Sequence, residues 1–396
     1  MVQRDDYPFA AQRRSGGIQD TKYWRLQAPA EDFLGMDSNA IDAQDRQALA
    51  EAAEMLAGGA TVAFPTETVY GLGADARNTA AVEAVFAAKG RPSDNPLIVH
   101  IADREALDPL VTEVSPAATA LIEAFWPGPL TLVLPVRPGV LSPLVTAGLD
   151  TVGVRMPAHG VAQALIREAG CPVAAPSANR SGRPSPTTAG HVRGDLAGYI
   201  GGVLDGGPAG VGLESTVVQV QPDGTAVILR PGGITAEQLA AVLGSGAVSA
   251  TPGEEAAARD AAAEDGPAPR APGMKYTHYA PRGWLGVVRG ATPQRVAEAA
   301  AARLAAAALS GETTGLLLFE EHRALYPANP AACVRSLGAL ASPEEGARAL
   351  YAALRDFDEA GATYILAEAC PETGLGAAIM NRLMKAAGGT VIEAGE

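Results

Sequence analysis

Apolar segments of helical and strand length alternate along residues 41–243, with short polar turns between them. Apolar residues at helical spacing predict helices at 41–56, 79–90, 116–126 and 236–243. Short apolar runs predict strands at 61–64, 97–101, 130–134, 152–156, 173–175, 215–220 and 225–229. The last two runs are joined by Pro222-Asp223-Gly224, which is typical of a hairpin turn, whereas residues 65–75 read as a polar turn. The alternation predicts an α/β domain with an antiparallel part.

The pattern changes on both sides of this domain. Residues 244–272 are rich in Ala, Gly, Pro, Glu and Asp without apolar periodicity, which is typical of a linker. Beyond it, strands at 284–288, 315–319 and 364–367 alternate with helices at 295–308 and 343–357, which predicts a smaller Rossmann-like domain. We therefore expect a poorly ordered N-terminal extension (1–40, with Met36 as an alternative start), a catalytic domain (41–247), a linker (248–283) and a C-terminal domain (284–396).

Composition narrows the class of function. The net charge of −14 disfavours an extended nucleic-acid surface, because neutralising phosphates requires a positive one, and it favours a pocket for a small anion. The three cysteines include no C-x-x-C pair, so neither a disulfide framework nor a zinc site is predicted, and a cytoplasmic protein is indicated. No apolar run reaches the length of a membrane span.

Two polar clusters interrupt the apolar pattern, namely Lys89-Gly90-Arg91 and Ser177-Ala178-Asn179. Gly90 is suited to end a helix in the left-handed conformation, and Arg91 then extends toward Pro92. Cations and hydroxyls on rigid turns suit a phosphate-bearing ligand. Each cluster alone is equally compatible with an ordinary helix end or turn, so the hypothesis depends on the two clusters lying together.

Arg155 stands inside an apolar strand, and a buried arginine is rare unless it is paired or binds an anion. A structural ion pair with Glu214 or Asp205 is the alternative. Thr151 lies four residues earlier, on the same face of the strand. Neither the P-loop pattern nor the dinucleotide fingerprint is present, so the common nucleotide-binding motifs are excluded.

Taken in order, several segments resemble those of the threonylcarbamoyl-AMP synthase family, which has a YrdC-like fold: the turn 65–73, Lys89-x-Arg91, the segment 126–131, Arg155-Met156-Pro157, Ser177-x-Asn179 and Glu214-Ser215-Thr216. This resemblance covers about residues 45–240. Residues 272–281 resemble the interdomain linker of the long, two-domain form, and residues 374–383 resemble the signature of its C-terminal domain. The resemblance implies an open α/β domain with a mixed twisted sheet, linked to a smaller Rossmann-like α/β domain.

The resemblance also implies an activity, the condensation of L-threonine, bicarbonate and ATP to threonylcarbamoyl-AMP and pyrophosphate. Mg²⁺ would accompany ATP without a protein metal site, and the product would pass to the tRNA threonylcarbamoyl-transfer machinery, with weak tRNA contact and no membrane. Carried over by motif, the threonine-binding residues are Thr68, His100, Arg155, Ala175 and Ser215. The ATP-binding residues are Arg91, Asn95, Thr151, Ser177, Ser185, Arg230 and Tyr279. The catalytic residues are Lys89, Arg91, Ser177 and Asn179.

Two other functions stay open from the sequence. A double-stranded RNA-binding or tRNA-binding module without turnover would use the same basic pocket, although the overall acidity disfavours it. A carbamoyl-transfer domain of the hydrogenase-maturation type shares the fold, but such chains carry zinc-finger regions, for which this chain lacks the cysteines.

Overall fold

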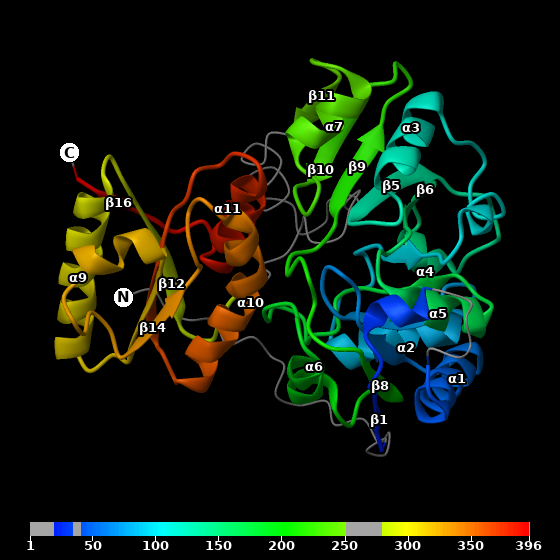
Figure 1. Cartoon of the computed structure of the whole chain (residues 1–396), viewed down its shortest axis with the longest axis horizontal. Coiled ribbons are helices and arrows are strands. Elements are labelled where there is room, and N and C mark those ends of the chain that lie inside the picture. The colour runs from blue at the N-terminus through cyan, green and yellow to red at the C-terminus, as the bar shows by residue number, and fades with distance from the viewer. Residues whose placement is uncertain (1–19, 35–40, 251–278, 396) are drawn as a thin grey trace.

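The computed structural model describes residues 20–34, 41–250 and 279–395. Within these residues, the larger domain is built on an eleven-stranded mixed sheet with the strand order β1-β8-β2-β3-β7-β4-β6-β5-β9-β10-β11. Its strands are β1 (Lys22–Arg25), β2 (Val62–Phe64), β3 (Gly71–Asp75), β4 (Ile98–His100), β5 (Leu130–Pro135), β6 (Thr151–Arg155), β7 (Val173–Ala174), β8 (Gly202–Asp205), β9 (Thr216–Val220), β10 (Ala226–Arg230) and β11 (Val248–Ala250). The predicted open α/β fold is confirmed (Figure 1).

Helices cover both faces of this sheet. They are α1 (Ala43–Ala57), α2 (Thr79–Lys89), α3 (Pro116–Phe125), α4 (Pro143–Thr146), α5 (Gly160–Ala169), α6 (Ala189–Leu196) and α7 (Ala236–Leu243), with short 3-10 turns η1 (Ala30–Phe33) and η2 (Arg104–Ala106). Asn78, Ser115 and Thr235 accept hydrogen bonds from backbone N–H groups in the first turns of α2, α3 and α7, as the capping signals predict.

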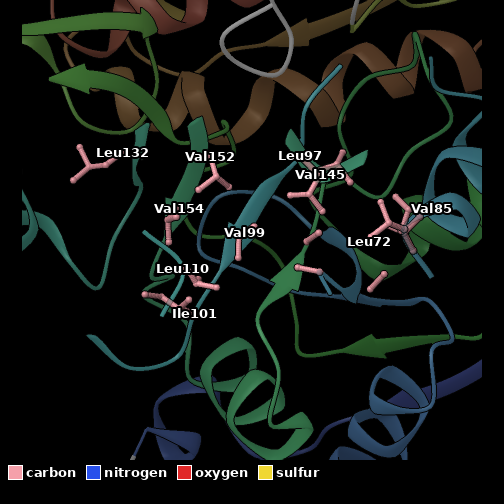
Figure 2. Close-up of a cluster of buried hydrophobic side chains, with 14 of the residues drawn as sticks. Leu72, Val85, Leu97, Val99, Ile101, Leu110, Leu132, Val145, Val152 and Val154 are labelled. Carbon is pink, nitrogen blue, oxygen red and sulfur yellow. The ribbon is translucent and has the colours of Figure 1, made fainter. Parts of the chain in front are cut away.

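Two apolar cores lie on opposite faces of the sheet, because successive strand residues point to opposite sides. Val62 and Phe64 of β2 pack with α1 and α5, whereas Ala63 between them packs into the other core. Figure 2 shows part of that second core, where Val99 of β4, Val152 and Val154 of β6 and Leu132 of β5 lie in one cluster. Strands buried on both faces explain why they read as continuous apolar runs.

The C-terminal domain contains, in the part described, a five-stranded parallel sheet in the order β14-β13-β15-β12-β16. Its elements are β12 (Trp284–Gly290), α9 (Pro293–Leu309), β13 (Thr314–Leu318), η3 (Glu320–Leu325), β14 (Cys333–Ser336), α10 (Pro343–Glu359), β15 (Tyr364–Glu368), α11 (Leu375–Ala386) and β16 (Val391–Ala394). Helices α10 and α11 lie on the side of this domain that faces the larger one (Figure 1).

The expected poorly ordered extension is wrong for residues 20–34. Strand β1 pairs in parallel with β8 at the edge of the sheet, and Leu26 and Phe33 are buried in the core under α1 and α5. The fully buried carboxylate of Asp45, in the first turn of α1, accepts hydrogen bonds from the backbone N–H groups of Gln27 and Ala28 at 2.7–3.0 Å. These contacts make the segment part of the larger domain. Residues 1–19 and 35–40 lie outside the described residues.

Two other expectations need correction. The polar turn predicted over 65–75 ends at residue 70, because residues 71–75 form β3 and pair with β2 and β7. The linker predicted from 248 begins with strand β11, which pairs in parallel with β10, so these residues extend the sheet. Most of the remaining linker, 251–278, lies outside the described residues. None of the helices that the structure describes is long and apolar enough to cross a membrane.

Candidate active site

The two polar clusters meet at the end of helix α2. Gly90 ends that helix with a φ of 62°, and the buried Lys89 ammonium donates hydrogen bonds to the carbonyl oxygens of Ser177 and, at 2.6 Å, Asn179. The Lys89 carbonyl accepts in return from the Ser181 N–H at 2.9 Å. Burial, and then the neighbouring charge of Arg91, hold the pKa of Lys89 well below its usual value. Lys89 therefore anchors the turn 177–181 on the end of α2.

Two buried amide side chains near this anchor, Asn95 and Asn179, have polar atoms without a hydrogen-bond partner among the described residues. The Asn95 amide is fully buried, and neither its oxygen nor its nitrogen has a hydrogen-bond partner among the described residues. Asn179 donates to the carbonyls of Arg180 and Arg183 at 2.9 Å, while its side-chain oxygen has no partner in the described chain. Buried polar groups are normally paired, so these amides indicate a place where a ligand binds.

Arg155, at the end of β6, is another buried cation that lines the pocket. Its Nη1 donates to Thr68 Oγ1 at 2.9 Å, and its Nε donates to the Gly128 carbonyl at 3.2 Å. Nη2 lies 2.6 Å from Glu67 Oε1 in a buried ion pair. The partner is thus Glu67, and not Glu214 or Asp205 as the alternative interpretation of the sequence suggested.

His100 is buried beside Arg155, at the end of β4. Its ring makes an edge-on contact with Phe64, with ring centroids 6.2 Å apart. Burial, followed by the positive charge of Arg155, lowers the pKa of His100 to about 3. The imidazole is therefore neutral near pH 7 and can offer hydrogen bonds to a ligand without adding a second positive charge.

Ser215, directly before β9, contacts two further polar residues, Thr131 and Arg230. Its hydroxyl lies 2.8 Å from the Thr131 hydroxyl, and its carbonyl accepts hydrogen bonds from Arg230 Nε and Nη2 at 3.2 and 2.9 Å. Arg230 ends β10, which runs antiparallel to β9, so the hairpin brings this guanidinium to the first residues of β9. Burial lowers the pKa of Arg230 from its usual value.

One pocket brings most of these groups together, with an empty volume of about 730 Å³ including the part open to solvent. Of the residues that sequence analysis proposed, the pocket is lined by Thr68, Lys89, Arg91, His100, Arg155, Ala175, Ser177, Asn179, Ser215, Arg230 and Tyr279. It is also lined by residues that sequence analysis did not propose: Thr66, Val69, Gly71, Pro96, Leu97, Ile98, Pro176, Ser181 and Glu214.

Three proposed residues do not line it. Ser185 is fully buried and donates to the Glu214 carboxylate at 2.6 Å, one residue away from Ser215. Asn95 lies directly before Pro96, which does line the pocket. Thr151 starts β6, and four residues of extended strand separate it from Arg155 by about 13 Å. The alternation that places both residues on one face does not bring Thr151 to the pocket.

The described residues contain no group of three or more His, Cys, Asp or Glu side chains able to hold a metal ion. Glu214 is the one carboxylate among the lining residues, and it already accepts hydrogen bonds from Ser185, Tyr351 and Arg382. A hard cation such as Mg²⁺ prefers several oxygen ligands.

The chain is a two-domain α/β protein: an open α/β domain, with a pocket lined by several cationic side chains, is joined to a domain with a parallel five-stranded sheet. Family models match the two parts separately: "Telomere recombination" matches residues 54–232, and "Threonylcarbamoyl-AMP synthase, C-terminal domain" matches residues 234–388. The threonylcarbamoyl-AMP synthase of Bacillus subtilis is 51% identical over 344 residues, 87% of this chain and 94% of its own length. That of Pyrococcus abyssi is 45% identical over 342 residues, 86% of this chain and 94% of its own.

A solved structure agrees with these sequence matches. The crystal structure of P. abyssi Sua5 complexed with L-threonine superimposes with a TM-score of 0.80 at 41% identity, covering 94% of this chain and 99% of that one. The chain belongs to the threonylcarbamoyl-AMP synthase family. The resemblance found in the sequence is thereby confirmed.

Proposed function

We propose that this pocket condenses L-threonine, bicarbonate and ATP to threonylcarbamoyl-AMP and pyrophosphate, as a nucleotidyltransferase-type enzyme. The relatives named for this product, and the neighbour complexed with L-threonine, support the proposal. The observation that carries it is the convergence of two cationic regions in one pocket, one around Lys89 and Arg91 and the other around Arg155. Two regions of this kind suit two anionic substrates that must react with each other.

Threonine would occupy the side formed by Thr68, His100, Arg155, Ala175 and Ser215. Arg155 would bind the substrate carboxylate while it keeps its contact with Thr68. The Ala175 N–H already donates to the Ile98 carbonyl, so the carbonyl of Ala175 is the backbone group proposed to accept from the threonine amine. Neutral His100 would contribute a hydrogen bond rather than charge.

ATP would occupy the other side, along Arg91, Ser177, Asn179 and Arg230, with Tyr279 at the interdomain edge. Asn95 and Ser185 would hold the nucleotide from just behind the pocket wall. Mg²⁺ would enter as part of the MgATP substrate, since the lining residues offer no carboxylate cage. Thr151 starts the strand that ends at Arg155, and it does not line the pocket. Its proposed contact with ATP therefore depends on the family resemblance alone.

The reaction would have two steps. The threonine amine attacks the bicarbonate carbon and water leaves, which forms a carbamate. A carbamate oxygen then attacks the α-phosphorus of ATP in line, a phosphorus–oxygen bond forms, and the bond to pyrophosphate breaks. Neither step needs a covalent enzyme intermediate, so positioning and charge stabilisation by the buried arginines would supply the catalysis.

The mixed anhydride is an activated acyl donor, so an acyl-transfer reaction must consume it. We propose the transfer of the threonylcarbamoyl group to N6 of adenosine 37 of tRNA as that reaction, in the cytoplasm. The tRNA itself would bind mainly to the transfer machinery, in line with the net charge of −14 on this chain.

Pyrophosphate release from ATP tests this proposal. Release should require threonine and bicarbonate together, and threonylcarbamoyl-AMP should appear in equal amount. Arg91→Ala should mainly raise the KM for ATP, whereas Arg155→Ala should mainly raise the KM for threonine, each by about tenfold or more because a charge-assisted contact is lost. Pyrophosphate release that ignores threonine and bicarbonate would reject the synthase, and equal effects of both variants on both substrates would reject the assignment of the two sides.

A further inference from the structure

A buried polar cluster joins the C-terminal domain to the wall of the pocket, and Glu214 is at its centre. The Glu214 carboxylate accepts hydrogen bonds from Ser185 Oγ at 2.6 Å, from Tyr351 Oη at 2.8 and 2.9 Å, and from Arg382 Nε at 2.8 Å. Ser185 and Glu214 belong to the larger domain, whereas Tyr351 lies on α10 and Arg382 on α11. Two helices of the C-terminal domain thus supply two of the three side chains that donate hydrogen bonds to this carboxylate.

Arg382 is the most deeply buried arginine among the described residues, with 0% of its surface exposed. Its guanidinium lies 5.5 Å from the centre of the Tyr279 ring, which in turn packs against Tyr351 with ring centroids 5.2 Å apart. Burying a charge is costly unless it is paired, so this position is occupied only because Glu214 neutralises it. The residues 374–383 that mark the C-terminal domain in the sequence thereby acquire a specific contact with the pocket.

Charge dominates the environment of Glu214. Burial alone would raise the pKa of its carboxyl, but the positive charges of Arg382 and Arg230 outweigh burial and bring it to about 2. Burial and the same carboxylate raise the pKa of Tyr351 well above its usual value, which keeps its hydroxyl a hydrogen-bond donor. The pocket wall therefore carries a permanent negative charge at a place where a polyanionic nucleotide is proposed to bind.

A carboxylate in this position would repel phosphate groups strongly if it were not compensated, because the surroundings are buried. The hydrogen bonds of Glu214 give this carboxylate a structural role in the pocket wall. Through Ser185 it ties the turn after β7 to the residues that start β9, and both segments line or support the nucleotide side. Arg382 cancels the charge of Glu214 while leaving these contacts in place.

A second interdomain ion pair comes from α10, the helix that carries Tyr351, and its arginine also contacts the turn that contains Ser185. Arg355 of α10 donates to both carboxylate oxygens of Asp195 at 2.9 and 3.1 Å, and it donates to the carbonyl of Pro184, the residue before Ser185. Gly212 sets the distance between the domains, because a Cβ there would lie 2.4 Å from the Cα of Arg348 in α10. Helix α10 is thus packed backbone to backbone against the pocket wall.

We propose that Arg382, together with Tyr351, is a positioning residue for the nucleotide side of the pocket: it neutralises Glu214, so that this carboxylate holds Ser185 without repelling the phosphates of ATP. The inference rests on the proposed function, and it assigns to the C-terminal domain a direct part in nucleotide binding. Loss of the positive charge at Arg382 leaves Arg230, which is itself proposed to bind ATP, as the remaining arginine that offsets the charge of Glu214. Loss of both charges removes the repulsion.

The test compares Arg382→Met, Glu214→Gln and the double variant Glu214→Gln/Arg382→Met in the full-length protein. Arg382→Met should raise the KM for ATP by about tenfold or more, with the KM for threonine changed by no more than about twofold. The double variant should recover most of the loss in ATP use, because glutamine keeps hydrogen bonds to Ser185 and Tyr351 without the charge. Arg382→Lys keeps the charge and should lie closer to the wild type than Arg382→Met.

Arg348→Ala is the matched interface control, since Arg348 is exposed on the same helix and donates to the Gly210 carbonyl at 2.9 Å without contacting the Glu214 cluster. This variant should leave the KM for ATP unchanged.

A double variant as impaired as Arg382→Met, or equal losses for ATP and threonine, would reduce Arg382 to a structural contact and overturn the inference. If Arg382→Met does not fold, the comparison of Arg382→Lys with Glu214→Gln/Arg382→Lys decides. The double variant leaves one unpaired positive charge, which attracts phosphates, so its KM for ATP should be no higher than that of Arg382→Lys. A higher KM in the double variant would overturn charge compensation.

The two proposals fail in different ways. A wild-type protein that releases no pyrophosphate with threonine and bicarbonate contradicts the proposed function. An active wild type in which Arg382→Met leaves the KM for ATP unchanged contradicts this inference alone.

Discussion

Lys89 and Arg155 are both buried cations at the pocket, and the protein accommodates them differently. Lys89 donates to the backbone carbonyls of Ser177 and Asn179, whereas Arg155 is paired with the Glu67 carboxylate and the Thr68 hydroxyl. Lys89 thus shapes the turn that faces the ligand. Arg155 already has a carboxylate partner, so a substrate carboxylate would have to share the guanidinium with Glu67, which places Glu67 close to the bound amino acid.

At this scale the sequence predicted which residues gather but not which atoms they contact. Arg155 was identified because a charged residue within an apolar strand needs a partner or a ligand, and Ser177 because it belongs to a polar cluster on a turn. Ser215 was proposed only from the family resemblance. The Glu67 pairing had no sequence signal, since it joins residues 88 positions apart through the β2–β3 turn. Glu214 entered the sequence analysis as an alternative partner of Arg155 and as part of the motif Glu214-Ser215-Thr216, without a role of its own.

His100 leads to a pH prediction. Its folded pKa is about 3, compared with about 6.5 in the unfolded chain, so between these values the unfolded state binds a proton that the folded state does not. Stability contributed by neutral His100 is therefore fully present above pH 6.5 and is lost as the pH falls toward 3. Between pH 7 and pH 5 the loss from this residue should be about 2 kcal/mol in the free energy of unfolding.

Urea unfolding of the wild type and His100→Gln at pH 7 and pH 5 measures this effect. The variant should lose less stability than the wild type between the two pH values, because glutamine does not titrate. His191→Gln is a useful comparison, since burial lowers the pKa of His191 to about 4 outside the pocket. Parallel pH dependence in wild type and His100→Gln would show that His100 is not the titrating group.

Among the elements, those with strong apolar runs and capping residues were predicted well, and those without were missed. Strands β4, β5 and β6 and helices α2, α3 and α7 lie within a few residues of their predicted limits. Strand β3 was not predicted, because Gly71 and Gly73 are typical of a turn. It forms because it pairs with β2 on one side and β7 on the other. Strand β1 was not predicted, because its sequence, KYWR, is polar. Polar residues are typical of an exposed edge strand.

Removing β1 and η1 should destabilise the larger domain. A chain that begins at Met36 loses β1, one of the two strands that pair with β8, and exposes the core that buries Leu26 and Phe33. It also leaves the buried Asp45 carboxylate without the N–H groups of Gln27 and Ala28. Together these losses should lower the free energy of unfolding by roughly 4 kcal/mol or more. Denaturant unfolding, with a chain that begins at Asp20 as the reference, measures the difference. Equal stability of the two chains would mean that the N-terminal segment does not support the domain.

For the whole molecule, the arrangement of the two domains was the part that the sequence could not supply. Apolar periodicity identified both domains, and residues 374–383 marked the second, but no local signal told that Arg382 would reach Glu214 or that Arg355 would reach Asp195. These contacts join segments 160 or more residues apart, and they depend on how two finished folds dock. An apolar cluster that includes Val69 and Leu213 from the larger domain continues into α10 and α11.

Because this interface combines an apolar cluster with two buried ion pairs, the two domains should unfold together, as one calorimetric transition. Gly212→Ala should separate that transition into two, since a Cβ at residue 212 meets the backbone of α10 at 2.4–2.6 Å and must push the domains apart. Gly207→Ala is the matched control: its φ of 88° imposes similar backbone strain, but no atom lies within 4 Å of the added Cβ. The control should lower the midpoint of a single transition by a few degrees. If both variants behave alike, the close packing at Gly212 does not couple the domains, and the C-terminal helices hold Glu214 without being needed for the joint stability of the chain.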